Sequence, residues 1–380
     1  MDRICFWSKG MFCEFIPNSR TLVFGGETYS YPIRWNTPGG RLYVLFSTDC
    51  NLRCPYCFQN NAVRCERSVD DNQTILYISE LQNRVNEIVL FGGEPFLTNN
   101  YNRVRAVLER FDYLKFIAFT NGNFEPLYCD LLKEFSYCFR SVIITMDGPK
   151  SIHNKRRFNP KQDSYDLIIN NLRTISDYGI VVNVQINVDK YNADYIGQLL
   201  EELYSYEEFR KHQFTLNPVK YIANAIESPQ LFELYFSLRR KYPLNLSVNN
   251  RLVGNLTRLF DMRPLNKDRC GLAKTYVLNL PAGNIYACPQ NATSEIGTLS
   301  ETAHIDTSSL NDLFLQTAYE YGKCKNCEYA FLCPYGCPYV ETPADCKERV
   351  KRDLSLVLEL MFNSPFSTGV AGLENIGAKE

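Results

Sequence analysis

Cys50-Asn51-Leu52-Arg53-Cys54-Pro55-Tyr56-Cys57-Phe58 is the stretch from which the rest of the chain is best understood. It places three thiols at the spacing C-x3-C-x2-C, directly after the apolar run 42–46. Three thiolates on one loop can hold three irons of a cubane cluster and leave the fourth iron open to a small molecule. A zinc site is the alternative, but zinc usually takes four ligands arranged in C-x2-C pairs.

The composition places the chain among ordinary globular proteins. It has 380 residues, 45% of them hydrophobic, and a formal net charge of −1. The absence of a long basic run argues against nucleic-acid binding, and no apolar stretch has the length of a membrane span. The first residues lack the pattern of a signal peptide, so we expect a cytoplasmic protein.

Cysteine is abundant for such a protein. Fifteen cysteines in a chain with no sign of export point to metal binding rather than to a disulfide framework. The three histidines are scattered, which argues against a histidine-rich zinc or iron centre.

Apolar runs with helical stretches between them predict the fold. The helical stretches carry apolar stripes at i, i+3, i+4 and i+7, as in Val104, Val107, Leu108 and Phe111. The strand-like runs are 42–48, 86–92, 114–120, 140–146, 181–188 and 213–219. Six βα units predict an α/β fold with a parallel sheet, a partial (β/α)6 version of the TIM barrel. In such folds the site lies at the carboxyl ends of the strands, where the Cys50 loop also falls.

Three further motifs follow predicted strands. Gly92-Gly93-Glu94-Pro95 ends the second strand and Thr120-Asn121-Gly122 ends the third. The segment 145–149, Thr-Met-Asp-Gly-Pro, ends the fourth and is followed by His153 and Arg157. Glycines let a backbone approach a ligand, Glu94 suits an ammonium group and Arg157 suits a carboxylate. Taken alone, each motif is equally compatible with a tight turn or a surface side chain.

Taken together, these motifs from about 41 to 220 resemble the radical S-adenosylmethionine (SAM) core of peptide and sulfatase maturases. The resemblance implies that SAM binds the open iron and is cleaved by one electron to a 5'-deoxyadenosyl radical. It implies that Tyr56 contacts the adenine. It also implies that Gly92, Gly93 and Glu94 contact the methionine amine. Thr145 and Arg157 would contact the ribose and the carboxylate.

A second set of cysteines occupies the C-terminal part of the chain. Its members are Cys270, Cys288, Cys324, Cys327, Cys333, Cys337 and Cys346. Seven cysteines suit zinc poorly, because four close one site and three leave another incomplete. The array resembles the SPASM extension of radical SAM peptide maturases, a cysteine-rich Fe–S domain with two auxiliary [4Fe–4S] clusters. The resemblance implies one cluster on Cys324, Cys327, Cys333 and Cys346, and another on Cys270, Cys288 and Cys337.

Two positions depart from the pattern of anaerobic sulfatase maturases. Tyr276 stands where those enzymes have an eighth cysteine, and Pro289 stands where they have an aspartate thought to act as base. Both departures argue against formylglycine formation and towards peptide crosslinking through a thioether, C–C or C–O bond. A sulfatase-type maturase, a peptide epimerase and a non-catalytic iron–sulfur electron carrier are the alternatives.

The motifs divide the chain into five expected parts. We expect a short N-terminal cap (1–40) with a hairpin at Gly25-Gly26, a radical SAM core (41–225), a helical bridge (226–265), a SPASM domain (266–362) and a flexible tail (363–380). The expected partners are a precursor peptide, a reductant such as flavodoxin or ferredoxin, and a separate peptide-recognition protein, but neither nucleic acid nor membrane. Cys65, Cys129 and Cys138 fit no motif and are expected to be core or surface thiols.

Overall fold

The computed structural model describes most of the chain between residues 4 and 362. The described residues are 4–8, 11–16, 21–24, 27–30, 35–36, 40–61, 69–220, 222–260, 265–266, 275–290, 294–305, 327, 329, 333 and 344–362. Several expectations fall outside them. These are Cys65, Cys270, Cys324, Cys337, the Gly25-Gly26 turn and the tail 363–380.

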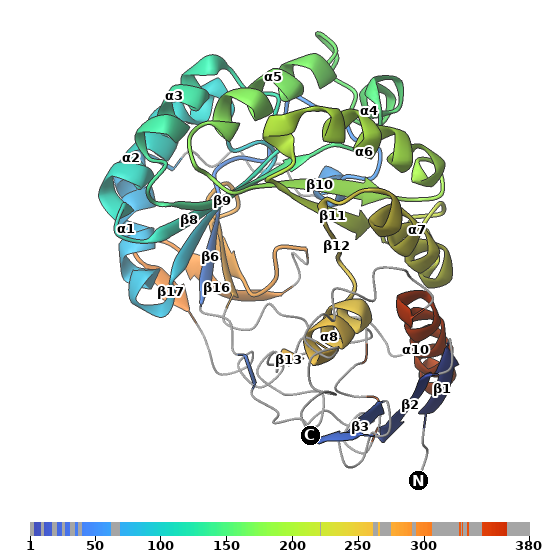
Figure 1. Cartoon of the computed structure of the whole chain (residues 1–380). Helices are drawn as coiled ribbons and strands as arrows, with labels where there is room; N and C mark the ends of the chain where they lie inside the picture. Colours follow the sequence, from blue (N-terminus) through green and yellow to red (C-terminus); the bar gives the residue numbers. More distant parts are fainter. Residues whose placement is uncertain are drawn as a thin grey trace, which may run out of the picture.

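All six predicted strands are present and pair in parallel, in the order of the sequence. They are β6 (Arg41–Leu45), β7 (Glu87–Phe91), β8 (Lys115–Thr120), β9 (Phe139–Thr145), β10 (Val182–Val188) and β11 (Gln213–Pro218). Their apolar character follows from burial, and β7 is buried along its whole length. The sheet curves into an open barrel, which confirms the predicted partial barrel (Figure 1).

Helices cover the outer face of this sheet (Figure 1). They are α1 (Asp71–Leu81), α2 (Tyr101–Phe111), α3 (Pro126–Glu134), α4 (Lys150–Arg156), α5 (Tyr165–Ser176) and α6 (Ile196–Ser205). The predicted stripe of α2 is fully buried, and α1 begins where the Asp70 carboxylate accepts the backbone N–H of Gln73 at 2.8 Å. The helices therefore leave the inner face and the carboxyl ends of the strands for chemistry.

The predicted helical bridge is wrong in one respect. Helices α7 (Ser228–Lys241) and α8 (Arg251–Phe260) are present, but strand β12 (Asn245–Val248) lies between them and pairs in parallel with β11. Its residues alternate between exposed and buried, so one face packs on the core while the other is exposed. Four residues with period-two alternation are too few to stand out beside the long stripe of α7.

The C-terminal part of the chain continues the same sheet. Strand β14 (Thr275–Asn279) pairs in parallel with β6, and β15 (Asn284–Tyr286), β16 (Glu295–Leu299) and β17 (Ala303–Ile305) follow antiparallel. Within the described residues the main sheet thus has eleven strands, from β12 to β17. The Tyr77 hydroxyl of α1 donates to the carbonyl of Ser300 at 2.5 Å and ties this extension to the helical layer.

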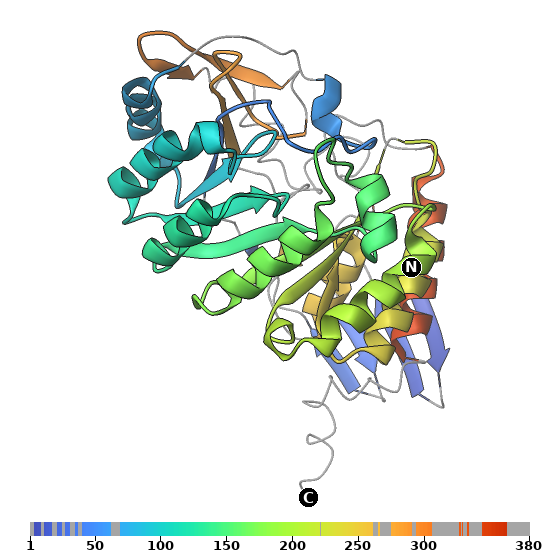
Figure 2. The same cartoon turned by 90° about the horizontal axis from the view of Figure 1, so that it is seen from above.

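The N-terminal strands form a separate antiparallel sheet. It comprises β1 (Ile4–Ser8), β2 (Met11–Ile16), β3 (Thr21–Phe24) and β4 (Glu27–Ser30), and the β3–β4 pair confirms the predicted hairpin. A short parallel pair joins β5 (Trp35–Asn36) to β13 (Leu265–Asn266). Helix α10 (Cys346–Phe362) packs between β1 and α7, as both views show (Figures 1 and 2). No helix in the described part of the chain combines the length and apolarity needed to cross a bilayer.

Candidate active site

The cysteine loop leaves the carboxyl end of β6 and reaches across the barrel mouth. The backbone N–H of Arg53 donates to the carbonyl of Phe158 at 2.7 Å, which fastens the loop to the segment after α4. The N–H of Cys57 donates to the carbonyl of Cys54 at 3.2 Å and closes a tight turn between these two thiols. The loop is therefore held at the edge where the parallel sheet was expected to place chemistry.

The two glycines after β7 let the backbone pass directly beneath this loop. The N–H of Gly93 donates to Ser47 at 2.9 Å, and the N–H of Glu94 donates to Asp49 at 2.8 Å. A Cβ atom on Gly93 would lie 2.1 Å from the carbonyl oxygen of Asp49, and Gly92 has a φ of +128°. Both positions therefore require glycine, one for space and one for conformation.

Glu94 points into the interior below the cysteine loop. Its side chain accepts the Thr120 hydroxyl at 2.7 Å, the backbone N–H of Asn121 at 2.6 Å and that of Phe96 at 2.9 Å. Burial raises the pKa of Glu94 to about 7, although these hydrogen bonds oppose the rise. A bound cation would stabilise the charged form of a carboxylate that is buried in this way.

The sulfur of Cys50 accepts hydrogen bonds from two N–H donors. One is the backbone of Leu52 at 3.4 Å and the other is the side-chain amide of Asn121 at 3.6 Å. Burial, assisted by Glu94, raises the pKa of Cys50 to about 11, and burial also raises the pKa of Cys54. Within the described residues no three acidic, cysteine or histidine side chains are already arranged around a metal position. Nevertheless, three thiols on one short loop, with amide donors at the sulfur of Cys50, fit the ligand set of an iron–sulfur cluster.

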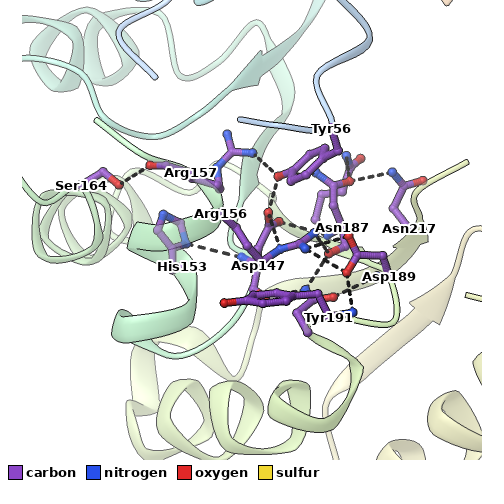
Figure 3. A network of polar contacts seen from close by, with 12 residues as sticks. Tyr56, Asp147, His153, Arg156, Arg157, Ser164, Asn187, Asp189, Tyr191 and Asn217 are labelled. Atoms are coloured by element: carbon purple, nitrogen blue, oxygen red, sulfur yellow. Dashed lines mark hydrogen bonds and ion pairs between the residues drawn. The ribbon is translucent and has the colours of Figure 1, made fainter. Parts of the chain in front are cut away.

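Tyr56 connects the cysteine loop to a buried polar network (Figure 3). Its hydroxyl donates to the carboxylate of Asp147 and accepts from Arg157 at 2.9 Å and from Asn187 at 3.4 Å. The Arg156 guanidinium lies 4.8 Å from the centre of the Tyr56 ring. The tyrosine is therefore fixed from several sides.

Arg156 and Asp189 form the ionic centre of this network. Their side chains are 2.7 Å apart, and each has only 5% of its surface exposed. Asp147, with no exposed surface, lies 3.5 Å from Arg156 and is also held by the Asn187 backbone. The sequence motifs pointed to Asp147 and to the pair Arg156-Arg157. Asp189 and its pairing with Arg156 were missed, because only the fold brings these segments together.

Arg157 is buried beside the cysteine loop. Burial opposes its charge, but Cys54, Tyr56 and Asp147 outweigh that effect and keep its pKa well above the ordinary value. Its Nε atom is buried and has no hydrogen-bond partner among the described residues. The bond from Nη1 goes to the phenol oxygen of Tyr56 rather than to a carboxylate. A buried, charged guanidinium with an N–H that has no partner among the described residues suits a carboxylate ligand.

Thr145, the remaining predicted contact, is the last residue of β9. Its side chain is half-buried and its backbone stands opposite Gln185 of β10. It lies two residues before Asp147, at the same carboxyl edge as the other predicted contacts.

An amide ladder of Asn187, Asn217 and Asn249 crosses the ends of β10, β11 and β12. Asn249 donates to Asn217 at 2.7 Å, and Asn217 donates to Asn187 at 2.7 Å. Asn187 in turn donates to Tyr56, so every bond points towards the cysteine loop. The sequence reasoning missed this ladder. Asparagines at the ends of otherwise apolar strands are the signal that could have revealed it.

The opposite part of the barrel interior is apolar and aromatic. Tyr43 and Phe91 meet edge to face with ring centres 5.3 Å apart, and Phe91 meets Phe119 in the same way at 6.0 Å. Val89, Ile117 and Val277 pack into the same cluster. The barrel interior therefore has one polar and one apolar wall.

Four of the seven C-terminal cysteines lie in the described residues. Cys288 follows β15 and is buried, and its N–H donates to the Ser294 hydroxyl at 3.1 Å. Cys327 and Cys333 are half-buried against the main core, and Cys346 begins α10. Because Cys270, Cys324 and Cys337 lie outside the described residues, the two expected ligand sets stay predictions.

Comparisons with known proteins identify a radical SAM domain and related maturation enzymes. Residues 44–203 match the model of the Radical SAM superfamily. The chain is 24% identical over 328 residues to a cysteine-type anaerobic sulfatase-maturating enzyme of Clostridium novyi (strain NT). That alignment covers 77% of this chain and 85% of the relative.

Two solved structures share the fold. Native anSMEcpe with bound AdoMet has a TM-score of 0.64 at 18% identity, over 87% of this chain and 99% of that one. Streptococcus suis SuiB bound to precursor peptide SuiA has a TM-score of 0.58 at 15% identity, over 84% of this chain and 76% of that one. Residues 44–203 therefore form a radical SAM domain, a kind of domain that uses SAM and a [4Fe–4S] cluster, and the chain is similar to maturation enzymes.

Proposed function

We propose that this protein is a radical SAM peptide maturase that forms an intrapeptide crosslink in a ribosomal precursor peptide. One observation carries the SAM part of the proposal. The cysteine loop is joined through Asn121 to the buried Glu94 and through Tyr56 to the buried Arg157. A site with three thiols, one buried carboxylate and one buried guanidinium matches the amino and carboxylate ends of SAM beside a cluster.

In this proposal Cys50, Cys54 and Cys57 hold the cluster. Glu94 accepts the ammonium of SAM, and Arg157 donates to its carboxylate. When bound, the cluster and SAM supply one-electron chemistry that removes a hydrogen atom from the substrate. The protein orients both partners and keeps water away from them.

Four further residues complete the proposed SAM contacts. Gly92 and Gly93 let the backbone approach the methionine end, as their close passage beneath the loop supports. Tyr56 lies against the adenine, and Thr145 offers its hydroxyl to the ribose. The fixed position of Tyr56 in its network supports a platform role for its ring.

The two walls of the barrel interior support the proposal that the substrate is a peptide. The ladder of Asn187, Asn217 and Asn249 presents amide groups, which hydrogen-bond well to a peptide main chain. The facing wall of Tyr43, Phe91 and Phe119 suits apolar side chains. SuiB, which shares the fold, has been solved with a precursor peptide.

We further propose two auxiliary clusters, on the two cysteine sets named from the sequence. They would take up the surplus electron of crosslinking, and a reductant such as flavodoxin or ferredoxin would reduce the SAM cluster. A separate protein could present the peptide. Three four-iron clusters predict about twelve irons per chain after anaerobic reconstitution. About four irons, or mainly zinc, would remove the auxiliary clusters from the proposal.

Formylglycine formation is the second candidate, because the alignment with a sulfatase-maturating enzyme covers 77% of the chain. Pro289 argues against it, since proline follows Cys288 where those enzymes have the proposed aspartate base. Tyr276 argues in the same direction. Its side chain is half-buried against the main core at the position of their eighth cysteine.

The first experiment tests SAM cleavage. Anaerobically reconstituted and reduced protein should make 5'-deoxyadenosine from SAM, measured by chromatography without a substrate. The Cys54→Ala variant should lose this activity, whereas Cys129→Ala should keep it, because Cys129 is a buried thiol on α3 away from the loop. A wild-type protein that makes none under these conditions would be an electron carrier or scaffold instead.

The second experiment identifies the bond. Small peptides encoded beside the gene are co-expressed anaerobically with the enzyme and analysed by mass spectrometry. Loss of two hydrogens together with loss of alkylatable thiols indicates a thioether, and the same loss with thiols intact indicates a C–C or C–O link. Unchanged mass with altered chirality indicates an epimerase. Formylglycine in a sulfatase-type target would favour the second candidate.

A further inference from the structure

Asn121 lies between the two parts of the proposed SAM site, the buried Glu94 and the cysteine loop. It follows β8 directly, and only 5% of its surface is exposed. Its backbone N–H donates to Glu94 at 2.6 Å, while its side-chain amide faces Cys50 and Asn51. One residue therefore contacts the buried carboxylate and the first thiol of the cysteine loop.

The orientation of the Asn121 amide follows from a backbone donor. Its Oδ1 accepts the N–H of Asn123 at 2.7 Å, and a backbone N–H can only donate. The NH2 group must therefore point the other way. One of its hydrogens goes to Asn51 Oδ1 at 2.7 Å, and the other is directed at Cys50 Sγ at 3.6 Å.

The loop itself keeps this amide in place. Asn51 donates from its own side chain to the carbonyl of Asn123 at 2.6 Å, so the 50–51 and 121–123 segments are bonded in both directions. Asn121 is thus a fixed donor rather than a side chain free to turn away.

We propose that Asn121 is a positioning residue that raises the reduction potential of the SAM-binding cluster by donating a side-chain N–H to the sulfur of Cys50. This inference rests on the proposed cluster site at Cys50, Cys54 and Cys57. Reduction adds negative charge to a cluster and its thiolates. A donor at a ligand sulfur stabilises the reduced form more than the oxidised form.

The test is a redox titration of the reconstituted full chain, followed by electron paramagnetic resonance. The signal that changes on addition of SAM identifies the relevant cluster. In Asn121→Leu, which keeps the branched shape of the side chain and removes both the donor and the acceptor, the midpoint potential should become more negative. We expect the equilibrium constant for reduction to fall by about tenfold, which is about 59 mV for one electron.

Asn123→Ala is the matched control. Asn123 is equally buried on the same segment, and the bonds that it makes to Asn121 and Asn51 come from its backbone. Its side-chain oxygen accepts no hydrogen bond among the described residues. The midpoint of this variant should equal that of the wild type, whereas an equal shift in both variants would reduce Asn121 to a packing role.

Asn121→Asp covers the case in which the leucine variant assembles no cluster. It keeps the acceptor for Asn123 but replaces the donor by an oxygen, so its midpoint should also become more negative. A wild-type midpoint in either loaded variant overturns the proposal. If neither variant binds iron while circular dichroism shows the fold intact, Asn121 acts in assembly instead and the proposal is also overturned. A wild type without a SAM-responsive cluster would be a failure of the proposed function itself.

Discussion

Arg157 donates a 2.9 Å hydrogen bond to the hydroxyl of Tyr56, and this contact joins the segment after α4 to the cysteine loop. The same hydroxyl donates to Asp147, so the phenol lies between a guanidinium and a carboxylate. Arg157 thereby keeps one polar partner in the buried site, while its Nε atom has none among the described residues. This arrangement leads to the first of four predictions.

Replacing Arg157 with glutamine should weaken SAM binding by about 10- to 100-fold, because the proposed charge-assisted bond to the carboxylate of SAM is lost. Anaerobic calorimetry on the reconstituted protein measures the change in Kd. Arg173→Gln serves as control, since Arg173 lies on the surface of α5 beside Glu208. An unchanged Kd in the Arg157 variant would remove this residue from the SAM site.

Glu94 should make stability depend on pH. Burial raises its pKa from the ordinary 4.5 to about 7, so folding favours the protonated form. The stabilisation is complete below about pH 4.5 and is lost as the pH rises through 7, by about 3 kcal/mol in total. The measurement is urea unfolding of the metal-free wild type and Glu94→Gln at several pH values.

The free energy of unfolding of the wild type, relative to that of Glu94→Gln, should fall across this range. A difference between wild type and Glu94→Gln that stays constant from pH 4.5 to pH 8 would contradict the assigned shift.

Removing one charge of the Arg156–Asp189 pair should be costly. Asp189→Asn removes the nearer of the two carboxylates beside the Arg156 guanidinium and leaves it with Asp147 at 3.5 Å, so we expect a loss of about 2–3 kcal/mol in the free energy of unfolding. Chemical denaturation measures this loss. The exposed pair of Asp345, just before α10, and Arg349 provides the comparison, and Asp345→Asn should have a far smaller effect. Equal effects of the two substitutions would show that burial of the first pair is unimportant.

Gly93→Ala should disturb the cysteine loop. The added methyl group would meet the backbone oxygens of Asp49 at 2.1 Å and Thr48 at 2.6 Å, so the loop has to move. We expect 5'-deoxyadenosine formation to fall at least about tenfold, since small displacements of a reacting group are costly. Gly254→Ala in α8 has open space around the new atom and should be neutral or stabilising by up to about 1 kcal/mol. Full activity of the Gly93 variant would show that the cysteine loop tolerates the added methyl group and would contradict this prediction.

The sequence predicted best the features that depend on residues close together in the chain. Apolar runs such as 86–92 predicted buried strands, and the stripe of α6, with Ile196, Leu199, Leu200 and Leu203 all buried, predicted a helix face. The glycines at 92 and 93 are also local signals, because glycine at a strand end indicates either a positive φ or the close approach of a ligand or another chain segment.

Features that depend on distant segments were harder to predict. β14 joins β6 across more than half of the chain, and nothing in residues 275–279 names that partner. The bond between Asn217 and Asn249 and the pair of Arg156 with Asp189 are equally invisible in the sequence, because the fold alone brings these side chains together. The cysteine pattern predicted the loop, but not that Asn121 would contact its first sulfur.

The pairing of β6 with β14 can form only late in the synthesis of the chain. β6 meets β7 early, but its other edge waits for a strand that leaves the ribosome only after the whole parallel sheet has been made. An unpaired edge strand beside the cysteine loop is a template for aggregation during that interval. Production of this protein should therefore benefit from low temperature or from chaperones that protect the unpaired edge of β6 until β14 has been made.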